Sequence, residues 1–446
     1  GKMWDTSGLA TGWYVVRIRI LHHGIEDSET TRVYFDDTLK PGWPQRISWD
    51  SCGKECLLWA GFLEPVVDDV DGDGRKEILI FKGGNPPRLM AYRHDGALLW
   101  QAAVGRTPAG GFNLHIPLIA DTDGDGKKEI FAYNIEDPLF GGDKNSAKLY
   151  AFDAQGNVLP GWPIQLPKDY RPTMLAADLD QDGGAEIIIQ GHLVQGDDEE
   201  RIIIVSGDGK IRSQWTLPDD GWSSAIEGTP GVGNFDEDPD LEIVVTKPGV
   251  NGFSVGEVHV FNADGRELPG WPVLIPGIPF SSPAVGDVDG DGREDIAVGA
   301  QGRSMYLWGR DGKALPGWPV AKDQDHWSSS ALADLDGDGD LEIAVNRISA
   351  GGGPQTEVYH HDGTPVFDWP QPMGGENHYS TLIGDVDGDK APDILTTGGG
   401  LQDGGVYAWT AQGMPISGFP KRTEADAQAP ATIADLDGDG AVEIIA

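Results

Sequence analysis

The chain has 446 residues, with 72 Asp and Glu against 33 Lys and Arg, which gives a formal net charge of −39. No basic stripe is present, so binding through a nucleic-acid phosphate backbone is excluded, and an anionic membrane surface would repel the protein. Hydrophobic residues make up 39% of the chain, enough for a sizeable core, and 64 glycines predict many turns and few long helices.

The beginning of the chain predicts a mature or truncated product. Gly1-Lys2-Met3-Trp4 leads directly into polar sequence, unlike a signal peptide. No run of 18 or more apolar residues is present that would span a bilayer. Only two cysteines occur, Cys52 and Cys56, so disulfides do not hold the fold together. This pair is open to three interpretations: a small-loop disulfide, free thiols, or half of a metal site.

Residues 1–37 are predicted to form strands that precede the main domain. The segment Gly12–Ile20 alternates apolar and polar residues, as a strand of an Ig-like sandwich would. A second strand is expected at Thr31–Phe35, followed by a turn and by Lys40–Pro44. These strands are interpreted as an Ig-like remnant, as a hairpin that closes the main domain, or as both.

From Asp69 onward an acidic unit recurs eight times. The first copy runs from Asp69 to Glu77 with the sequence Asp-Val-Asp-Gly-Asp-Gly-Arg-Lys-Glu, and Ile-Leu-Ile follows it. Further copies, 47 to 57 residues apart, begin at Asp121, Asp178, Asn234, Asp287, Asp334, Asp385 and Asp435. A period of this length indicates a repeat architecture with one supersecondary unit per copy.

Each copy lies in the same local pattern of short strands. A short apolar run precedes the acidic unit, and a β-rich run such as Ile78–Phe81 follows it. A further strand such as Leu89–Tyr92 then reaches an Asp-Gly turn, a strong hairpin signal, and a fourth strand adjoins Pro-Gly-Trp-Pro. Four antiparallel strands per unit without helices predict a β-propeller. At a fixed place in each unit, the tryptophans are expected to pack between blades.

The fold class is therefore predicted to be all-β, a propeller with about eight four-stranded blades in residues 38–446. The eighth copy, from Asp435, has only two strands before the chain ends. We expect N-terminal strands to pair with these C-terminal strands and complete the eighth blade, which would remove exposed edges. A seven-bladed propeller with additional pieces is the alternative.

The acidic units are predicted to bind Ca²⁺. Acidic groups recur at positions 1, 3, 5 and 9, and a glycine at position 6 permits a bend that directs the position-7 carbonyl inward. Ca²⁺ takes six to eight oxygen ligands in flexible geometry, whereas an EF-hand would need its acid at position 12 between helices. Zn²⁺ is disfavoured because the loops contain no His or Cys.

Positions 1, 3, 5, 7 and 9 supply the predicted metal ligands. They are Asp69, Asp71, Asp73, Arg75 and Glu77; Asp121, Asp123, Asp125, Lys127 and Glu129; Asp178, Asp180, Asp182, Gly184 and Glu186; Asn234, Asp236, Asp238, Asp240 and Glu242; Asp287, Asp289, Asp291, Arg293 and Asp295; Asp334, Asp336, Asp338, Asp340 and Glu342; Asp385, Asp387, Asp389, Ala391 and Asp393; and Asp435, Asp437, Asp439, Ala441 and Glu443. Weaker binding, or water in place of the ion, is expected in the fourth loop, with Asn234 and Pro239, and in the seventh, with Lys390 at position 6.

The pattern Asp-x-Asp-x-Asp-Gly-x-x-Glu/Asp before an apolar strand resembles the FG-GAP (VCBS-type) repeat family, which includes the integrin α-subunit propellers. The resemblance covers about 390 residues of the chain. It implies that the cation loop joins the first and second strands of each blade on one face. It also implies an extracellular protein with an adhesive or carbohydrate-associated role.

A glycan or protein partner is predicted to bind the face opposite the calcium loops. Aromatic and basic residues precede several first strands there: Trp59, His115, Tyr170, Arg171, Trp222, Phe280, His326, Trp327, His378 and Tyr379. They could stack on sugar rings or serve as an apolar anchor. The alternative is that they fill the space between blades.

The function predicted from these features is an extracellular calcium-binding module for adhesion or binding. One alternative is a structural domain of a surface layer, a filament or a larger secreted protein. Another is a polysaccharide lyase or glycoside hydrolase with His115, Arg171, His326 and His378 as candidates, although no spacing relates them to one another. Neither a nucleophile elbow nor a P-loop, dinucleotide fingerprint or His-Glu-x-x-His motif is present.

Overall fold

The computed structural model describes residues 12–22, 25–35, 40, 43, 65–82, 86–105, 116–134, 147–166, 170–193, 200–217, 228–248, 255–301, 304–321, 326, 328–348, 353–374, 380–399, 404–422 and 430–445. Two compact units are distinguished, one of residues 1–47 with 95–97, and one of residues 48–94 with 98–446. The described part of the chain contains no helix of the length and apolar character needed to cross a membrane.

The N-terminal unit contains one antiparallel pair, β1 (Gly12–His22) and β2 (Ile25–Phe35). Both predicted strand segments are thus confirmed as strands, and they pair with each other. Further along, the Trp43 N–H donates to the Lys40 carbonyl at 3.1 Å. The same bond precedes the fourth strand of other repeats, as between Trp162 and Leu159 at 3.1 Å. Completion of the eighth blade by N-terminal strands remains a prediction.

In the described part of the second unit, seven antiparallel sheets have four strands each and an eighth has two. In chain order they are β3–β6 (Val66–Asp68, Glu77–Lys82, Arg88–Tyr92, Leu98–Ala103), β7–β10 (Leu118–Ala120, Glu129–Asn134, Lys148–Phe152, Ile164–Gln165), β11–β14 (Tyr170–Ala177, Glu186–Leu193, Glu200–Val205, Ile211–Leu217), β15–β18 (Gly231–Gly233, Glu242–Pro248, Val255–Phe261, Val273–Pro276), β19–β22 (Ala284–Gly286, Asp295–Gly299, Ser304–Trp308, Val320–Ala321), β23–β26 (Ala331–Ala333, Glu342–Arg347, Gln355–Tyr359, Gln371–Pro372), β27–β30 (Leu382–Gly384, Asp393–Gly398, Gly405–Thr410, Lys421–Arg422) and β31–β32 (Thr432–Ala434, Glu443–Ile445). The predicted β-propeller is confirmed, with one sheet for each acidic repeat.

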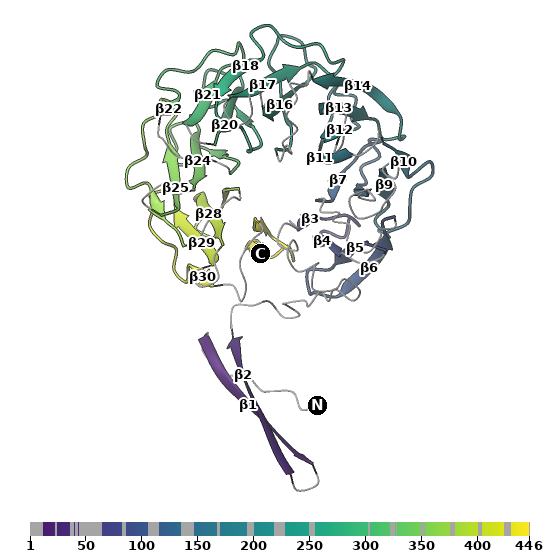
Figure 1. Ribbon diagram of the computed structural model, residues 1–446, viewed down its shortest axis with the longest axis vertical. Coiled ribbons are helices and arrows are strands. Elements are labelled where there is room, and N and C mark those ends of the chain that lie inside the picture. The colour runs from purple at the N-terminus through teal and green to yellow at the C-terminus, as the bar shows by residue number, and fades with distance from the viewer. Residues whose placement is uncertain are drawn as a thin grey trace. The chain divides into compact units, whose positions relative to one another are not determined.

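The core lies between consecutive sheets, which follow one another in chain order (Figure 1). Neighbouring residues of a strand point to opposite faces, so one strand can serve two interfaces. In β8, Ile130 packs with Leu79 of the preceding sheet, whereas Phe131 packs with Ile189 and Ile203 of the next. Strands of continuous apolar sequence are therefore explained by burial on both faces.

The tryptophans that precede the fourth strands join one blade to the next, as predicted. Trp271, Trp318 and Trp369 are buried. Their indole N–H groups donate to backbone carbonyls in the hairpin of the following blade, at 3.2 Å to Arg310, 2.7 Å to His361 and 2.9 Å to Ala411. These contacts hold the turns of the following hairpins, in which Gly312, for example, has a φ of +74° that glycine readily adopts.

The last acidic loop bonds to the first as other neighbouring loops bond to each other. The backbone N–H at position 8 donates to a carbonyl of the preceding loop, as from Leu241 to Leu179 at 2.8 Å and from Leu341 to Val288 at 3.0 Å. The Lys76 N–H donates to the Leu436 carbonyl at 2.9 Å in the same way. The two-stranded sheet β31–β32 therefore occupies the position of a further blade beside β3–β6.

Candidate cation-binding loops

Each acidic loop connects the first strand of a sheet to the second, as the family resemblance implies. In the first loop, Asp69 accepts backbone N–H groups from Gly72 at 2.8 Å and from Gly74 at 2.9 Å. Asp71 accepts from Asp73 at 3.1 Å, and Asp73 accepts from Arg75 at 2.8 Å. The second and seventh loops repeat all four bonds. The alternating aspartates thus fold the backbone around their own carboxylates.

The acid at position 9 fixes the other end of every loop. In all eight loops its carboxylate accepts the backbone N–H of position 2, at 2.7 to 3.2 Å. The residue at position 2 is itself anchored: Leu179 and Val288, for example, are fully buried between sheets. Position 9 therefore begins the second strand and also holds the start of the loop.

Burial raises the pKa of the position-9 acids in the first seven loops. The pKa of Glu77, Glu242 and Asp295 rises to about 7 because desolvation disfavours the charged form, and nearby aspartates add to the effect. The backbone N–H of position 2 acts in the opposite direction by stabilising the carboxylate. A bound cation would oppose this rise in pKa, because it would stabilise the charged form of the carboxylate.

Carboxylate oxygens converge in several loops within the described residues. Groups whose possible ligand atoms lie within 4.8 Å of one another include Asp69, Asp71 and Asp73; Asp121, Asp123 and Asp125; Asp178, Asp180 and Glu186; and Asp236, Asp238 and Glu242. Hard oxygen donors of this kind suit Ca²⁺ better than softer metals. Ligation by the position-7 carbonyls remains a prediction.

The fourth loop contains a buried carboxylate oxygen that a cation would satisfy. Glu242 is 0% exposed, and its Oε2 accepts the Phe235 N–H at 2.8 Å. Its Oε1 is buried and has no hydrogen-bond partner in the described structure. A buried carboxylate oxygen is costly without a partner, so a cation between Glu242, Asp236 and Asp238 would satisfy it.

The third loop contains a positive charge that the motif did not reveal. Arg212, in β14, places its guanidinium 2.7 Å from Asp180 and 2.9 Å from Glu186. Both acids were predicted as metal ligands. The guanidinium therefore compensates the charge that a cation would otherwise compensate. Because Arg212 lies 26 residues beyond Glu186, only the register of the third sheet brings them together.

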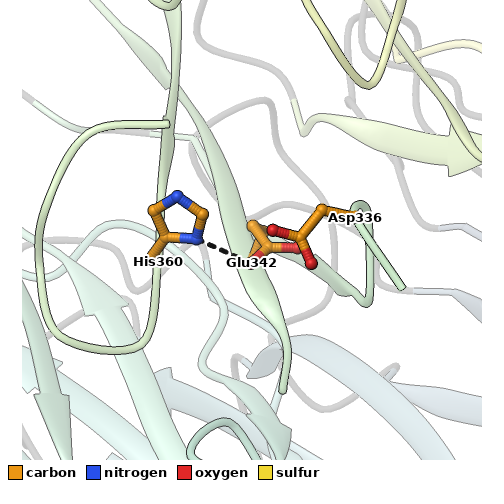
Figure 2. Close-up of side chains that lie close together, drawn as sticks. All are labelled: Asp336, Glu342 and His360. Carbon is orange, nitrogen blue, oxygen red and sulfur yellow. Dashed lines mark hydrogen bonds and ion pairs between the residues drawn. The ribbon is translucent and has the colours of Figure 1, made fainter. Parts of the chain in front are cut away.

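The sixth loop differs by contact with two histidines from the hairpin that follows β25. His360 Nδ1 lies 3.0 Å from Glu342 Oε1, and Asp336 completes a group of possible ligands within 4.8 Å (Figure 2). His361 Nδ1 pairs with Asp340 at position 7. No histidine lies within the loops themselves, as the sequence shows, but the sixth loop receives two from the hairpin of its own sheet.

The seventh loop bends as the sequence predicts. Lys390 at position 6 adopts a φ of +72°, the left-handed conformation that glycine provides in other loops. Its backbone N–H still donates to Asp385, at 3.0 Å. The loop geometry is thus retained at the cost of backbone strain.

The predicted partner face falls mostly outside the described residues. This holds for Trp59, His115, Trp222, Trp327, His378 and Tyr379, and for Tyr170 and Arg171 only the backbone is described. The Cys52–Cys56 pair also lies outside them. His326 is 1% exposed, and its Nε2 lies 3.2 Å from Glu357 Oε2. For this residue the structure agrees with packing inside the fold.

Comparison with known protein families identifies the repeat. A family model described as FG-GAP-like repeat matches residues 69–132, 234–298 and 287–345. This chain contains FG-GAP-like repeats. No curated protein matches the sequence at a significant level.

Solved structures share the fold. A rhamnogalacturonan lyase of Bacillus licheniformis aligns with 99% of this chain and 79% of its own length, at 17% identity and a TM-score of 0.58. The exotype rhamnogalacturonan lyase YesX covers the same shares at 18% identity and 0.59. The BP39L lectin from Burkholderia pseudomallei aligns over 80% of this chain and 99% of its own, at 12% identity and 0.50. At these identities the likeness concerns the fold alone.

Proposed function

We propose that this FG-GAP-repeat propeller is an extracellular calcium-binding module that presents a surface to a glycan or protein partner. The observation that carries the calcium proposal is the geometry common to all eight loops, in which a position-9 acid holds the N–H of position 2. Carboxylates within 4.8 Å of one another are brought together in this way. Such a constellation is expected to need a divalent cation.

Electrostatics explains why calcium would stabilise the fold. Two unit charges about 4 Å apart at a protein surface interact by roughly 4 kcal/mol, and each loop holds several carboxylates. The unfolded chain separates these charges, so Ca²⁺ binds the folded form selectively and stabilises it by mass action. Loops of extracellular proteins bind Ca²⁺ with dissociation constants of about 10⁻⁴–10⁻³ M, which suits the calcium-rich exterior.

Thermal unfolding tests the calcium proposal. The melting temperature of the 446-residue chain should rise steadily as Ca²⁺ is added to chelator-treated protein. Mg²⁺ at equal concentration serves as the matched control, and it should stabilise less because it retains its waters. A midpoint that is the same in chelator and in millimolar Ca²⁺ would contradict the proposal.

The partner is proposed to be a glycan or a protein. The fold is shared with a lectin, and a propeller face is a common place for a ligand site. A glycan array probed in Ca²⁺ should give specific signals that disappear when the protein is heat-denatured. If no glycan binds and no protein partner is captured, the structural-domain alternative gains support.

A second candidate function is polysaccharide cleavage by β-elimination. It is favoured by one specific observation: two rhamnogalacturonan lyases align with 99% of this chain. Incubation with rhamnogalacturonan should then release unsaturated products that absorb in the ultraviolet, and heat-inactivated protein should release none. Absence of such products with both intact and depolymerised substrate would exclude this candidate.

A further inference from the structure

The sixth loop has a donor set that the other described blades lack. His360 occupies the first position after the third strand of its sheet, where its N–H donates to the Thr364 carbonyl at 2.9 Å. The same backbone bond marks the equivalent residue in five other blades. Those residues are Asp153, Ser206, Asn262, Gly309 and Thr410, and in the first blade the position holds Arg93. No other described blade therefore offers an imidazole at this point.

We propose that His360, Glu342 and Asp336 bind a borderline divalent cation, such as Zn²⁺ or Co²⁺, in preference to Ca²⁺. Ca²⁺ takes oxygen ligands, whereas imidazole nitrogen suits first-row transition metals and zinc. The inference rests on the proposed cation-binding role of the loops, and it assigns a different metal to one of them. The other seven loops remain oxygen-donor sites.

The geometry accommodates a shared ion in place of the hydrogen bond between His360 and Glu342. His360 Nδ1 and Glu342 Oε1 are 3.0 Å apart, which matches two adjacent ligands of one ion with bonds of about 2.1 Å. Asp336 contributes a third donor within 4.8 Å, and it is exposed, so an ion could enter from solvent. Figure 2 shows the imidazole and the two carboxylates close together, from the hairpin on one side and the loop on the other.

The rest of the loop holds this donor set in place. Glu342 is 0% exposed, and its Oε2 accepts the Leu335 N–H at 2.7 Å, so Oε1 faces His360. His361 pairs with Asp340 and ties the hairpin to the loop a second time. Second contacts of this kind orient metal ligands and raise metal affinity.

The test is a calorimetric titration of the intact chain with Zn²⁺ in the presence of saturating Ca²⁺, which occupies oxygen-only sites. The wild type should bind about one equivalent of Zn²⁺, and His360→Gln should weaken this binding by roughly tenfold or more. Asp336→Asn should weaken it as well, although it leaves the His360–Glu342 bond intact. His94→Gln, on the hairpin of the first blade, is the matched control and should bind Zn²⁺ as the wild type does.

Co²⁺ provides a spectroscopic readout. Its visible absorption in the wild type should report nitrogen and oxygen ligands, and His360→Gln should lose that signal while its calcium-dependent melting temperature stays unchanged. The inference is overturned if the wild type binds no Zn²⁺ in the presence of saturating Ca²⁺. It is also overturned if His360→Gln or Asp336→Asn binds Zn²⁺ as tightly as the wild type. It is overturned equally if His94→Gln abolishes the binding.

The two proposals can fail separately. If Ca²⁺ leaves the melting temperature unchanged while Zn²⁺ binding depends on His360, the calcium proposal fails and the zinc site stands. If Ca²⁺ stabilises the protein while Zn²⁺ binding is independent of His360, the calcium proposal stands and the zinc site is rejected.

Discussion

The third and fourth acidic loops are neighbours joined by a backbone hydrogen bond, and they differ in how their negative charge is compensated. Leu241 of the fourth loop donates its N–H to Leu179 of the third, and both position-9 acids accept the N–H of position 2. The third loop has the full motif, yet Arg212 pairs with two of its acids. The fourth departs from the motif at two positions, yet it has a buried carboxylate oxygen without a hydrogen-bond partner.

The motif thus determines the shape of the loop, whereas residues outside the motif determine how much the loop needs a cation. By the motif alone, the third loop ranks above the fourth as a calcium site. By charge compensation, the order reverses, because the Arg212 guanidinium already compensates the charge of Asp180 and Glu186, although Asp180 Oδ1 has no hydrogen-bond partner among the described residues. Calcium dependence should therefore be stronger in the fourth loop.

The largest expected effect comes from Glu242→Ala. This change removes the acceptor of the Phe235 N–H and leaves a cavity, which together should lower the free energy of unfolding by about 3 kcal/mol. Urea unfolding in Ca²⁺ measures it. The matched change Glu186→Ala in the third loop should reduce the calcium-dependent part of stability less, because that loop depends less on the ion. Equal calcium-dependent losses in both variants would show that the two loops depend on the ion to the same extent.

Glu237→Ala is the control for the fourth loop, because this side chain is exposed and lies at position 4, which carries no predicted ligand. Its effect should stay within about 0.5 kcal/mol. A loss as large as that of Glu242→Ala would mean that the loop responds to any truncation and not to the missing carboxylate.

The next effect is a pH dependence in calcium-free buffer. The pKa of Glu242 is raised by burial to about 7, so the folded protein keeps a proton that the unfolded chain releases near pH 4.5. Stability from this group is complete below that pH and is lost as pH rises through 7, by about 3 kcal/mol. Glu242→Gln cannot titrate, so its unfolding free energy should exceed that of the wild type at pH 8 and match it near pH 4.

Calcium should remove the difference in unfolding free energy between the wild type and Glu242→Gln at pH 8. The bound ion stabilises the carboxylate of the wild type, which the glutamine lacks. Unfolding free energies of the wild type and Glu242→Gln, measured in chelator and in Ca²⁺ from pH 4 to 8, provide the check. Parallel curves for the two proteins in chelator would show that Glu242 is not the titrating group.

Arg212→Gln should make the third loop more dependent on calcium. Without the guanidinium, Asp180 and Glu186 repel each other, and calcium-free stability should fall by about 1 kcal/mol, since Arg212 is partly exposed. Added Ca²⁺ should restore the loss, and calorimetry should show tighter calcium binding than in the wild type. Lys210→Gln, which alters only an exposed pair with Asp208, is the control and should change neither quantity.

The propeller and its loops were accessible from the sequence because their determinants are local. The acidic unit, the Asp-Gly turn and the Pro-Gly-Trp-Pro segment lie within one repeat of about 50 residues, and each constrains the backbone by hydrogen bonds or by φ. Their recurrence then specifies how many blades to expect. Burial of both faces of strands such as β8 follows from their continuous apolar sequence.

Contacts between distant residues were not accessible in the same way. Arg212 reaches Glu186 through the pairing of β12 with β13 and of β13 with β14, and His360 reaches Glu342 from the next hairpin. A signal did exist, because both lie at fixed distances from the Asp-Gly turn of their own repeat. Alignment of the seven four-stranded repeats by that turn would have singled out both residues as exceptions.

The smallest expected effect concerns the seventh loop, where strain and charge can be separated. Lys390 has a φ of +72°, which costs a residue with a Cβ roughly 1 kcal/mol relative to glycine. Lys390→Gly removes the strain and the positive charge, so it should raise the unfolding free energy by about 1 kcal/mol and tighten calcium binding. Lys390→Ala removes the charge alone and should tighten calcium binding without the gain in calcium-free stability. If the two variants were equally stable in chelator, the left-handed backbone would carry no strain at this position, and the charge alone would distinguish the seventh loop from the others.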